Sequence, residues 1–195
     1  MSARIALLVA TLSAVLGAAA RAAQPEDPMA LTRDVLGRSN TIVRGEGDRK
    51  QKLAALSDLL RGFLDTNALA RLAAGKNLED RTPEEEREFL TLFHEFFVRT
   101  YVQRLLLFDA PDFEFGEERV NGDRAEVATA VVTPGDRFAV DYTLHRTPAG
   151  WRVTDIVVEG VSLARNFRSQ FDAAVAKDSF QGLLERMRAK IAAPA

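Results

Sequence analysis

The spacing of hydrophobic residues along this chain changes twice. From Met29 to Phe108 apolar residues recur every three or four positions, which is typical of amphipathic helices. Between Phe113 and Val158 they alternate or form short β-branched runs bounded by turn residues, which predicts strands. After Ser162 the helical spacing returns. This order of helices, antiparallel strands and helices predicts an α+β fold in one domain.

The first helical region divides into three predicted helices, over residues 29–43, 49–64 and 66–74. Asp48 and Asp65 are expected N-caps, because a carboxylate accepts hydrogen bonds from the unpaired N–H groups of a first turn. Gly45 and Gly75 stand where helices commonly end.

A longer, aromatic helix is predicted from Thr82 to Phe108. Thr82 caps it, Pro83 takes the first helical position, and three glutamates follow at the positive end of the helix dipole. Its apolar arc, from Phe89 onward, is broader than the single face of a surface helix. We therefore expect this helix to be core on more than one side, or to line a cavity.

Four strands follow, separated by the turn signals Asn121-Gly122, Pro134-Gly135 and Pro148-Ala149-Gly150. In the third strand the alternation places Phe138, Val140, Tyr142 and Leu144 on one face and Asp141 and His145 on the other. A four-stranded antiparallel meander is the prediction.

The stretch from Trp151 to Phe171 predicts a strand that runs directly into a helix capped by Ser162. Arg165 and Arg168 fall in the first turns, where the dipole favours negative charge. An anion bound at this helix end would account for both arginines. The alternative is two solvated side chains on a polar face.

Composition narrows the classes of function. The 195 residues are 47% hydrophobic with a formal net charge of −2, so no basic surface indicates nucleic acid. The chain has no cysteine and only two histidines, which are too few of the usual ligands for a structural zinc site.

The N-terminus has the pattern of a secretory signal peptide. Arg4 precedes an uncharged apolar run over 5–20, and Ala20 and Ala22 supply small residues before a cleavage point after Ala22. We expect residues 1–22 to be removed and residues 23–195 to form a single exported, soluble domain.

Helices laid across one face of a curved sheet make a wedge that is open at one end, where an apolar ligand could enter. The side chains expected to line this internal apolar cavity come from the aromatic helix, the sheet and the helix after Ser162: Phe93, Phe97, Tyr101, Val140, Tyr142, Trp151, Val153, Val161, Leu163, Phe167 and Phe171.

The segment GWRVTDIVVEGVSLARNFRSQF, residues 150–171, resembles the signature of the MlaC family of phospholipid-binding proteins. The stretches FLDTNALARLAAG (63–75) and TPEEEREFLTLFHEFFVRTYVQRLL (82–106) are also similar to the family. Phe167 stands where tyrosine is commoner and Leu78 where tryptophan is usual. The resemblance covers nearly all of the expected mature chain.

This resemblance implies an NTF2-like cone with acyl chains inside. The implied activity is non-covalent carriage of phospholipid between the two membranes of a Gram-negative envelope, which maintains outer-membrane lipid asymmetry. The implied partners are an outer-membrane lipoprotein–porin complex and an inner-membrane ABC transporter with a ring of MCE domains. The carrier itself is expected to be monomeric, without catalysis, cofactor or metal. Ser162, Arg165, Asn166 and Arg168 are the candidates for headgroup or partner contact.

Two other classes remain open from the residues themselves. Cone-shaped folds also host isomerases and dehydratases that use a buried Asp or His, for which His94, Asp141, His145 and Asp155 are the candidates. Asp155 could equally mark a bulge or be a hydrogen-bonded buried carboxylate. In the third class, the aromatic helix is ordinary core and the surface binds only proteins.

Overall fold

The computed structural model describes residues 27–106 and 111–193. The expected signal peptide, and Leu107 and Phe108 of the predicted aromatic helix, lie outside the described residues. Within the described ranges, no helix is both long and apolar enough to cross a bilayer.

The three N-terminal helices form as predicted and are followed by a short 3₁₀ turn: α1 (Pro28–Arg44), α2 (Arg49–Phe63), α3 (Thr66–Ala74) and η1 (Gly75–Leu78). Asp48 and Gln51 make a reciprocal capping box at the start of α2. Asp65 accepts a hydrogen bond from the N–H of Ala68. These caps satisfy backbone donors that the first turn leaves unpaired.

The aromatic helix begins at the predicted residue but is not one regular helix. Thr82 and Glu85 form a capping box at the start of α4 (Pro83–Phe97), and the backbone hydrogen bond at Thr82 lowers the pKa of Glu85. The helix then passes through a π-helical turn, η2 (Val98–Val102), into a short α5 (Gln103–Leu105). The spacing of apolar residues did not reveal this interruption, because a π-turn shifts the helical phase within a segment that is apolar on several sides.

The strands form an antiparallel meander in chain order: β1 (Asp112–Asn121), β2 (Arg124–Val132), β3 (Arg137–Thr147), β4 (Gly150–Val158) and β5 (Val161–Ser162). The predicted four strands are confirmed, and the structure adds β5, a two-residue strand on the free edge of β4. The turn before β5 places Glu159 and Gly160 at positive φ, which folds the chain back onto β4.

A β-bulge in β4 decides which of its residues face the core. Leu144 of β3 pairs with Val153, and Tyr142 pairs with Ile156, so one extra residue of β4 lies between the two pairs. Trp151 and Val153 therefore share a face with Ile156, which strict alternation would put on the opposite face.

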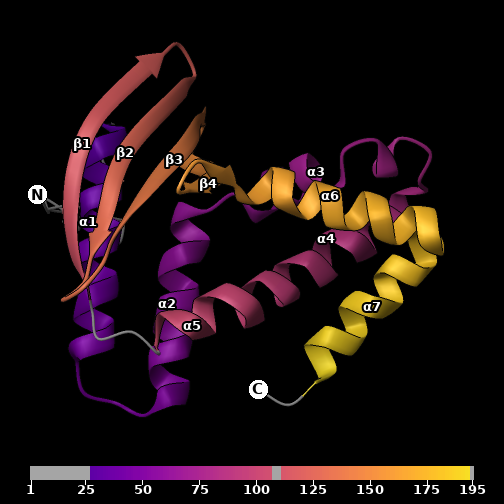
Figure 1. The fold of residues 1–195 in the computed structure, drawn as a ribbon, viewed down its shortest axis with the longest axis horizontal. Helices are drawn as coiled ribbons and strands as arrows, with labels where there is room; N and C mark the ends of the chain where they lie inside the picture. Colours follow the sequence, from indigo (N-terminus) through magenta and orange to yellow (C-terminus); the bar gives the residue numbers. More distant parts are fainter. Residues whose placement is uncertain (1–26, 107–110, 194–195) are drawn as a thin grey trace, which may run out of the picture.

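Figure 1 shows a strongly curved sheet with α1 against one face, and a group of helices that extends away from the β4 side. Helices α1 and α2 contact the sheet, and α6 (Leu163–Lys177) runs beside α3. Helix α7 (Phe180–Ala192) returns along α4. One continuous hydrophobic cluster extends through both groups. The order of helices, antiparallel strands and helices confirms the predicted α+β architecture.

Asp155 joins the sheet to α6. Its Oδ1 accepts hydrogen bonds from the N–H groups of Ile156 (2.9 Å) and Ala164 (3.0 Å), and its Oδ2 accepts from the Ser162 hydroxyl. The Ser162 Oγ in turn accepts from the N–H of Arg165, as predicted for the N-cap. Asp155 is thus a hydrogen-bonded carboxylate that caps α6 together with Ser162.

Replacing Asp155 with alanine should lower the free energy of unfolding by about 1.5–3 kcal/mol, because the two backbone N–H groups and the hydroxyl that donate to this carboxylate would lose their charged acceptor. Urea unfolding monitored by circular dichroism measures the change. The matched control is Asp141→Ala, on the face of the sheet opposite Tyr142, which should change stability by no more than about 0.5 kcal/mol. Equal midpoints for the two variants would contradict the capping role.

Candidate functional site

The side chains expected to line a cavity come from two surfaces that meet in the core. On the helical side, the rings of Phe89, Phe93, Phe96, Phe97, Tyr101, Phe167, Phe171 and Phe180 form an aromatic cluster across α4, η2, α6 and α7, with centroids 5.1–6.2 Å apart. Rings at these separations are in direct contact. In this structure the cluster fills the space between α4 and α6.

The sheet supplies the second surface. Tyr142 packs edge-on against Phe63 of α2 with ring centroids 5.7 Å apart, and burial raises the pKa of its phenol. The phenol is therefore neutral at physiological pH and can act as a hydrogen-bond donor. Trp151 and Val153 are 1% and 2% exposed. This face of the sheet is apolar with few polar groups.

All of the predicted lining residues except Val161 belong to the single hydrophobic cluster or pack against it. Val161 is 57% exposed at the sheet edge. Phe63 and Ile156 also contact this interior and were not among the predicted lining residues. The helical spacing of α2 indicated that Phe63 is buried, whereas the bulge that turns Ile156 toward Tyr142 leaves no local signal.

Burial is incomplete on particular elements of this interior. Val98, Tyr101 and Leu106 on and after η2, and Val140 and Ile156 on the sheet, are only partly buried although they pack against the core. Leu105 and Phe138 are 38% and 41% exposed. At these elements, as at several positions of α1, α2, α4 and α6, the apolar interior reaches the protein surface.

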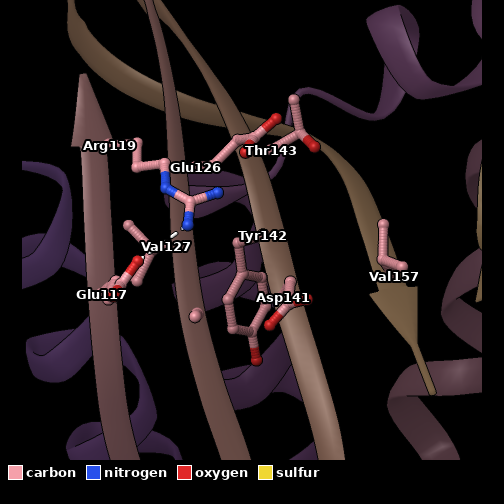
Figure 2. Close-up of a pocket in the computed structure, with 9 residues that line it drawn as sticks. Glu117, Arg119, Glu126, Val127, Asp141, Tyr142, Thr143 and Val157 are labelled. Atoms are coloured by element: carbon pink, nitrogen blue, oxygen red, sulfur yellow. Dashed lines mark hydrogen bonds and ion pairs between the residues drawn. The ribbon is translucent and has the colours of Figure 1, made fainter. Parts of the chain in front are cut away.

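A hollow of about 390 Å³ opens on the opposite face of the sheet. Figure 2 shows it across β1 to β4 with the N-terminal helices behind the sheet. Its rim is charged, with Glu117 bonded to Arg119 at 2.8 Å, and Glu126 and Asp141 on the next strands. Covering these carboxylates with an acyl chain would cost their hydration without replacing it. This hollow does not suit an apolar ligand.

The residues at the start of α6 have different environments. Ser162 is 4% exposed and bonded on both sides, so its hydroxyl serves the cap. Arg168 donates from Nε and Nη2 to the carbonyl of Leu72 at the end of α3. Gly75 leaves room for this side chain, because the Cβ of an alanine at position 75 would lie only 2.9 Å from the Arg168 Nε. Arg165 and Asn166 are exposed.

Both histidines contact the junction between α2 and α3. His145 Nε2 lies 3.0 Å from Asp65 Oδ2, and His94 Nδ1 lies 3.2 Å from the Thr66 hydroxyl. The N–H of Asp65 donates to Val153 O, so this junction ties the helices to β4. These contacts give each histidine a structural partner. No group of three or more His, Asp or Glu side chains in the described part of the chain is arranged to hold a metal ion.

The fold and the site define a small α+β domain whose aromatic and aliphatic interior is enclosed between a curved sheet and a group of helices. The chain belongs to the MlaC family, described as MlaC protein, whose model matches residues 30–189. This finding confirms the family resemblance of the sequence.

Two known proteins are similar to this chain. Toluene tolerance protein ttg2D of Pseudomonas putida is 25% identical over 127 residues, which cover 64% of this chain and 59% of that protein, so the match spans less than two thirds of the relative. A phospholipid-binding protein of Ralstonia solanacearum, solved in complex with a phospholipid, is similar in structure with a TM-score of 0.76. It is 23% identical, and the match covers 85% of this chain and 97% of that one.

Replacing Arg168 with alanine should lower the free energy of unfolding by about 1 kcal/mol, because the carbonyl of Leu72 loses a charged donor. Arg165→Ala, one turn away on the same helix, should change it by less than about 0.5 kcal/mol. Chemical unfolding of the two variants side by side makes the comparison. No loss of stability in Arg168→Ala would return this arginine to the candidates for ligand contact.

Proposed function

We propose that this protein binds phospholipid non-covalently in its apolar interior and carries it across the space between two membranes. The observation that carries the proposal is the continuous apolar core between sheet and helices, which reaches the surface near η2 and the ends of β3 and β4. Membership of the MlaC family and the phospholipid bound to the similar Ralstonia solanacearum protein support it.

The hydrophobic free energy of burying acyl chains favours a carrier that docks before it transfers lipid. Two acyl chains of about 15 methylenes each, at ~0.8 kcal/mol for each CH₂ removed from water, amount to roughly 24 kcal/mol. This sum exceeds the practical ceiling of about 18–21 kcal/mol for non-covalent affinity, so it is not a binding energy. A bilayer is nearly as apolar as a protein core, and transfer between the two is close to balanced. Exposure to water during transfer is the barrier, which direct contact with a partner lowers.

The side chains considered for catalysis support a carrier over an enzyme. Asp155 is engaged by three donors at the start of α6, and Asp141 lies on the face of the sheet opposite Tyr142. His94 and His145 contact Thr66 and Asp65 outside the aromatic cluster. A general base must lie within hydrogen-bond reach of a bound substrate, and none of these groups faces the apolar interior.

The proposed setting is the periplasm. The partners would be an outer-membrane lipoprotein–porin complex and an inner-membrane ABC transporter with a ring of MCE domains. Carriage between them would maintain the lipid asymmetry of the outer membrane. No cofactor is required, since phospholipid is cargo.

Bulky substitutions inside the apolar interior should reduce cargo. Val140→Trp and Phe97→Trp should each lower the ratio of phospholipid to protein, because the larger side chain takes space that acyl chains need. Organic extraction of the purified protein, followed by mass spectrometry, measures this ratio. Reproducible absence of phospholipid from the unmodified protein would instead favour an interaction module or an enzyme.

Val157→Trp is the matched control. Val157 pairs with Asp141 on the opposite face of the same sheet, so the same bulk is added outside the interior. Its lipid content should equal that of the unmodified protein. If all three variants retain full lipid content, the cargo does not lie between the sheet and the helices.

Arg165 tests whether charge at the start of α6 guides docking. Arg165→Glu should slow lipid transfer between donor and acceptor complexes at low salt and have less effect at high salt, because steering between exposed charges is screened. Lipid content at equilibrium should change little, since a solvent-exposed contact contributes about 1 kcal/mol or less. A transfer rate that is unchanged at both salt concentrations would leave Arg165 a solvated side chain.

If residues 1–22 are removed during export, the mature protein begins near Ala23. Mass spectrometry of protein from the periplasmic fraction of its native host should show an N-terminus near Ala23. Intact Met1 on protein from the cytoplasm would contradict a role between membranes.

A further inference from the structure

The interior that is proposed to hold acyl chains is closed in this structure. Neighbouring rings of the aromatic cluster lie at contact distance, for example Phe93 and Phe167 at 5.3 Å. An acyl chain cannot pass between rings in contact. If this interior takes up phospholipid, one of its walls must move.

Most of the walls are held by buried side chains. The α1–α2 hairpin buries Leu31, Val35, Leu56 and Phe63 at 4% exposure or less, and β1 to β4 are held by backbone hydrogen bonds on successive ladders.

Helix α4 is fixed on two sides. Phe89 and Phe93 are fully buried against α6 and α7. At its start, Glu86 pairs with Arg71 of α3 and Glu88 with Arg188 of α7.

The segment after α4 buries fewer of its side chains. Among its described side chains from Val98 to Leu106 only Val102 is buried, and Leu105 is 38% exposed. The ring of Tyr101 stacks on Phe97 at 5.1 Å and meets Phe167 at 5.8 Å. These contacts connect the segment to the aromatic cluster.

The backbone changes at the boundary between these two parts. The N–H of Gln103 donates to Val98 O, five residues earlier, where an α-helix would pair residues four apart. A π-turn interrupts the regular ladder, so bending there breaks fewer regular hydrogen bonds than bending inside α4.

We infer that the π-turn Val98–Val102 is the joint at which Tyr101 and α5 swing away from Phe97 and Phe167 to admit acyl chains. The inference rests on the proposed function and adds how its site opens. Tyr101 would leave its contacts with Phe97 and Phe167 in this movement, while α4 stays in place.

The absence of cysteine from the chain allows site-specific spin labels. The test pair is Leu105→Cys with Ser169→Cys, which reports α5 against α6. The control pair is Thr91→Cys with Ser169→Cys, which reports α4 against α6. All three positions are exposed. Distances are measured by pulsed electron resonance before and after loading from vesicles of phosphatidylethanolamine and phosphatidylglycerol, with bound lipid counted by mass spectrometry.

Loading should shift the mean Leu105–Ser169 distance beyond the width of the control distribution, while the Thr91–Ser169 distance stays constant. An unchanged Leu105–Ser169 distance in protein that carries lipid overturns the joint and leaves the proposed function intact. Movement of both pairs also overturns it, because the motion would then involve α4. Protein that takes up no lipid defeats the proposed function, and the inference with it.

Deletion of Thr100 tests the turn itself. Removing one residue from the π-turn allows pairing four residues apart to continue, and the loading-dependent shift of the Leu105–Ser169 pair should be lost. Retention of the full shift in a folded deletion variant contradicts a joint at this turn. If the deletion variant does not fold, the two label pairs in the undeleted chain still decide the question.

Discussion

The carboxylate of Asp155 is the connection on which the arrangement of sheet and helices depends. It accepts from the backbone of β4, from the hydroxyl of Ser162 and from the first turn of α6. A charged acceptor that is shared by a strand and a helix fixes the direction in which the helix leaves the sheet. That direction brings Phe167 and Phe171 onto the aromatic face of α4.

The bulge just before Asp155 has an equally large consequence. It adds one residue to β4 and so brings Trp151, Val153 and Ile156 to the same face. Without it, Trp151 and Val153 would lie on the face opposite Ile156. A register shift of one residue in β4 therefore decides which of its side chains face the interior and which face the charged hollow.

The distribution of buried contacts explains how the proposed binding interior can also be a stable core. Phe89, Phe93 and Leu144 are buried in the middle of the fold and hold its elements together. Tyr101, Val140 and Ile156 are partly buried at its margin. Local opening costs least where few apolar contacts must be broken, so a ligand that enters at the margin leaves the centre of the core intact.

The sequence by itself determined the order of most helices and strands and the residues at which several helices begin. Asp48, Asp65, Thr82 and Ser162 cap helices at the predicted residues, because a cap acts within three positions of itself. Asn121-Gly122 likewise sets its hairpin. The family resemblance, carried by residues 150–171, was also readable from sequence alone and is confirmed by the family match.

Only the tertiary structure decided which apolar residues share a face and which polar ones have partners. The pairing of His145 with Asp65 spans 80 positions of the chain, and that of Arg168 with Leu72 spans 96. The bulge in β4 and the π-turn after Phe97 each shift the phase of a periodic pattern by one residue. Periodicity within one segment cannot reveal such a shift, because a periodic pattern assumes a constant number of residues per repeat.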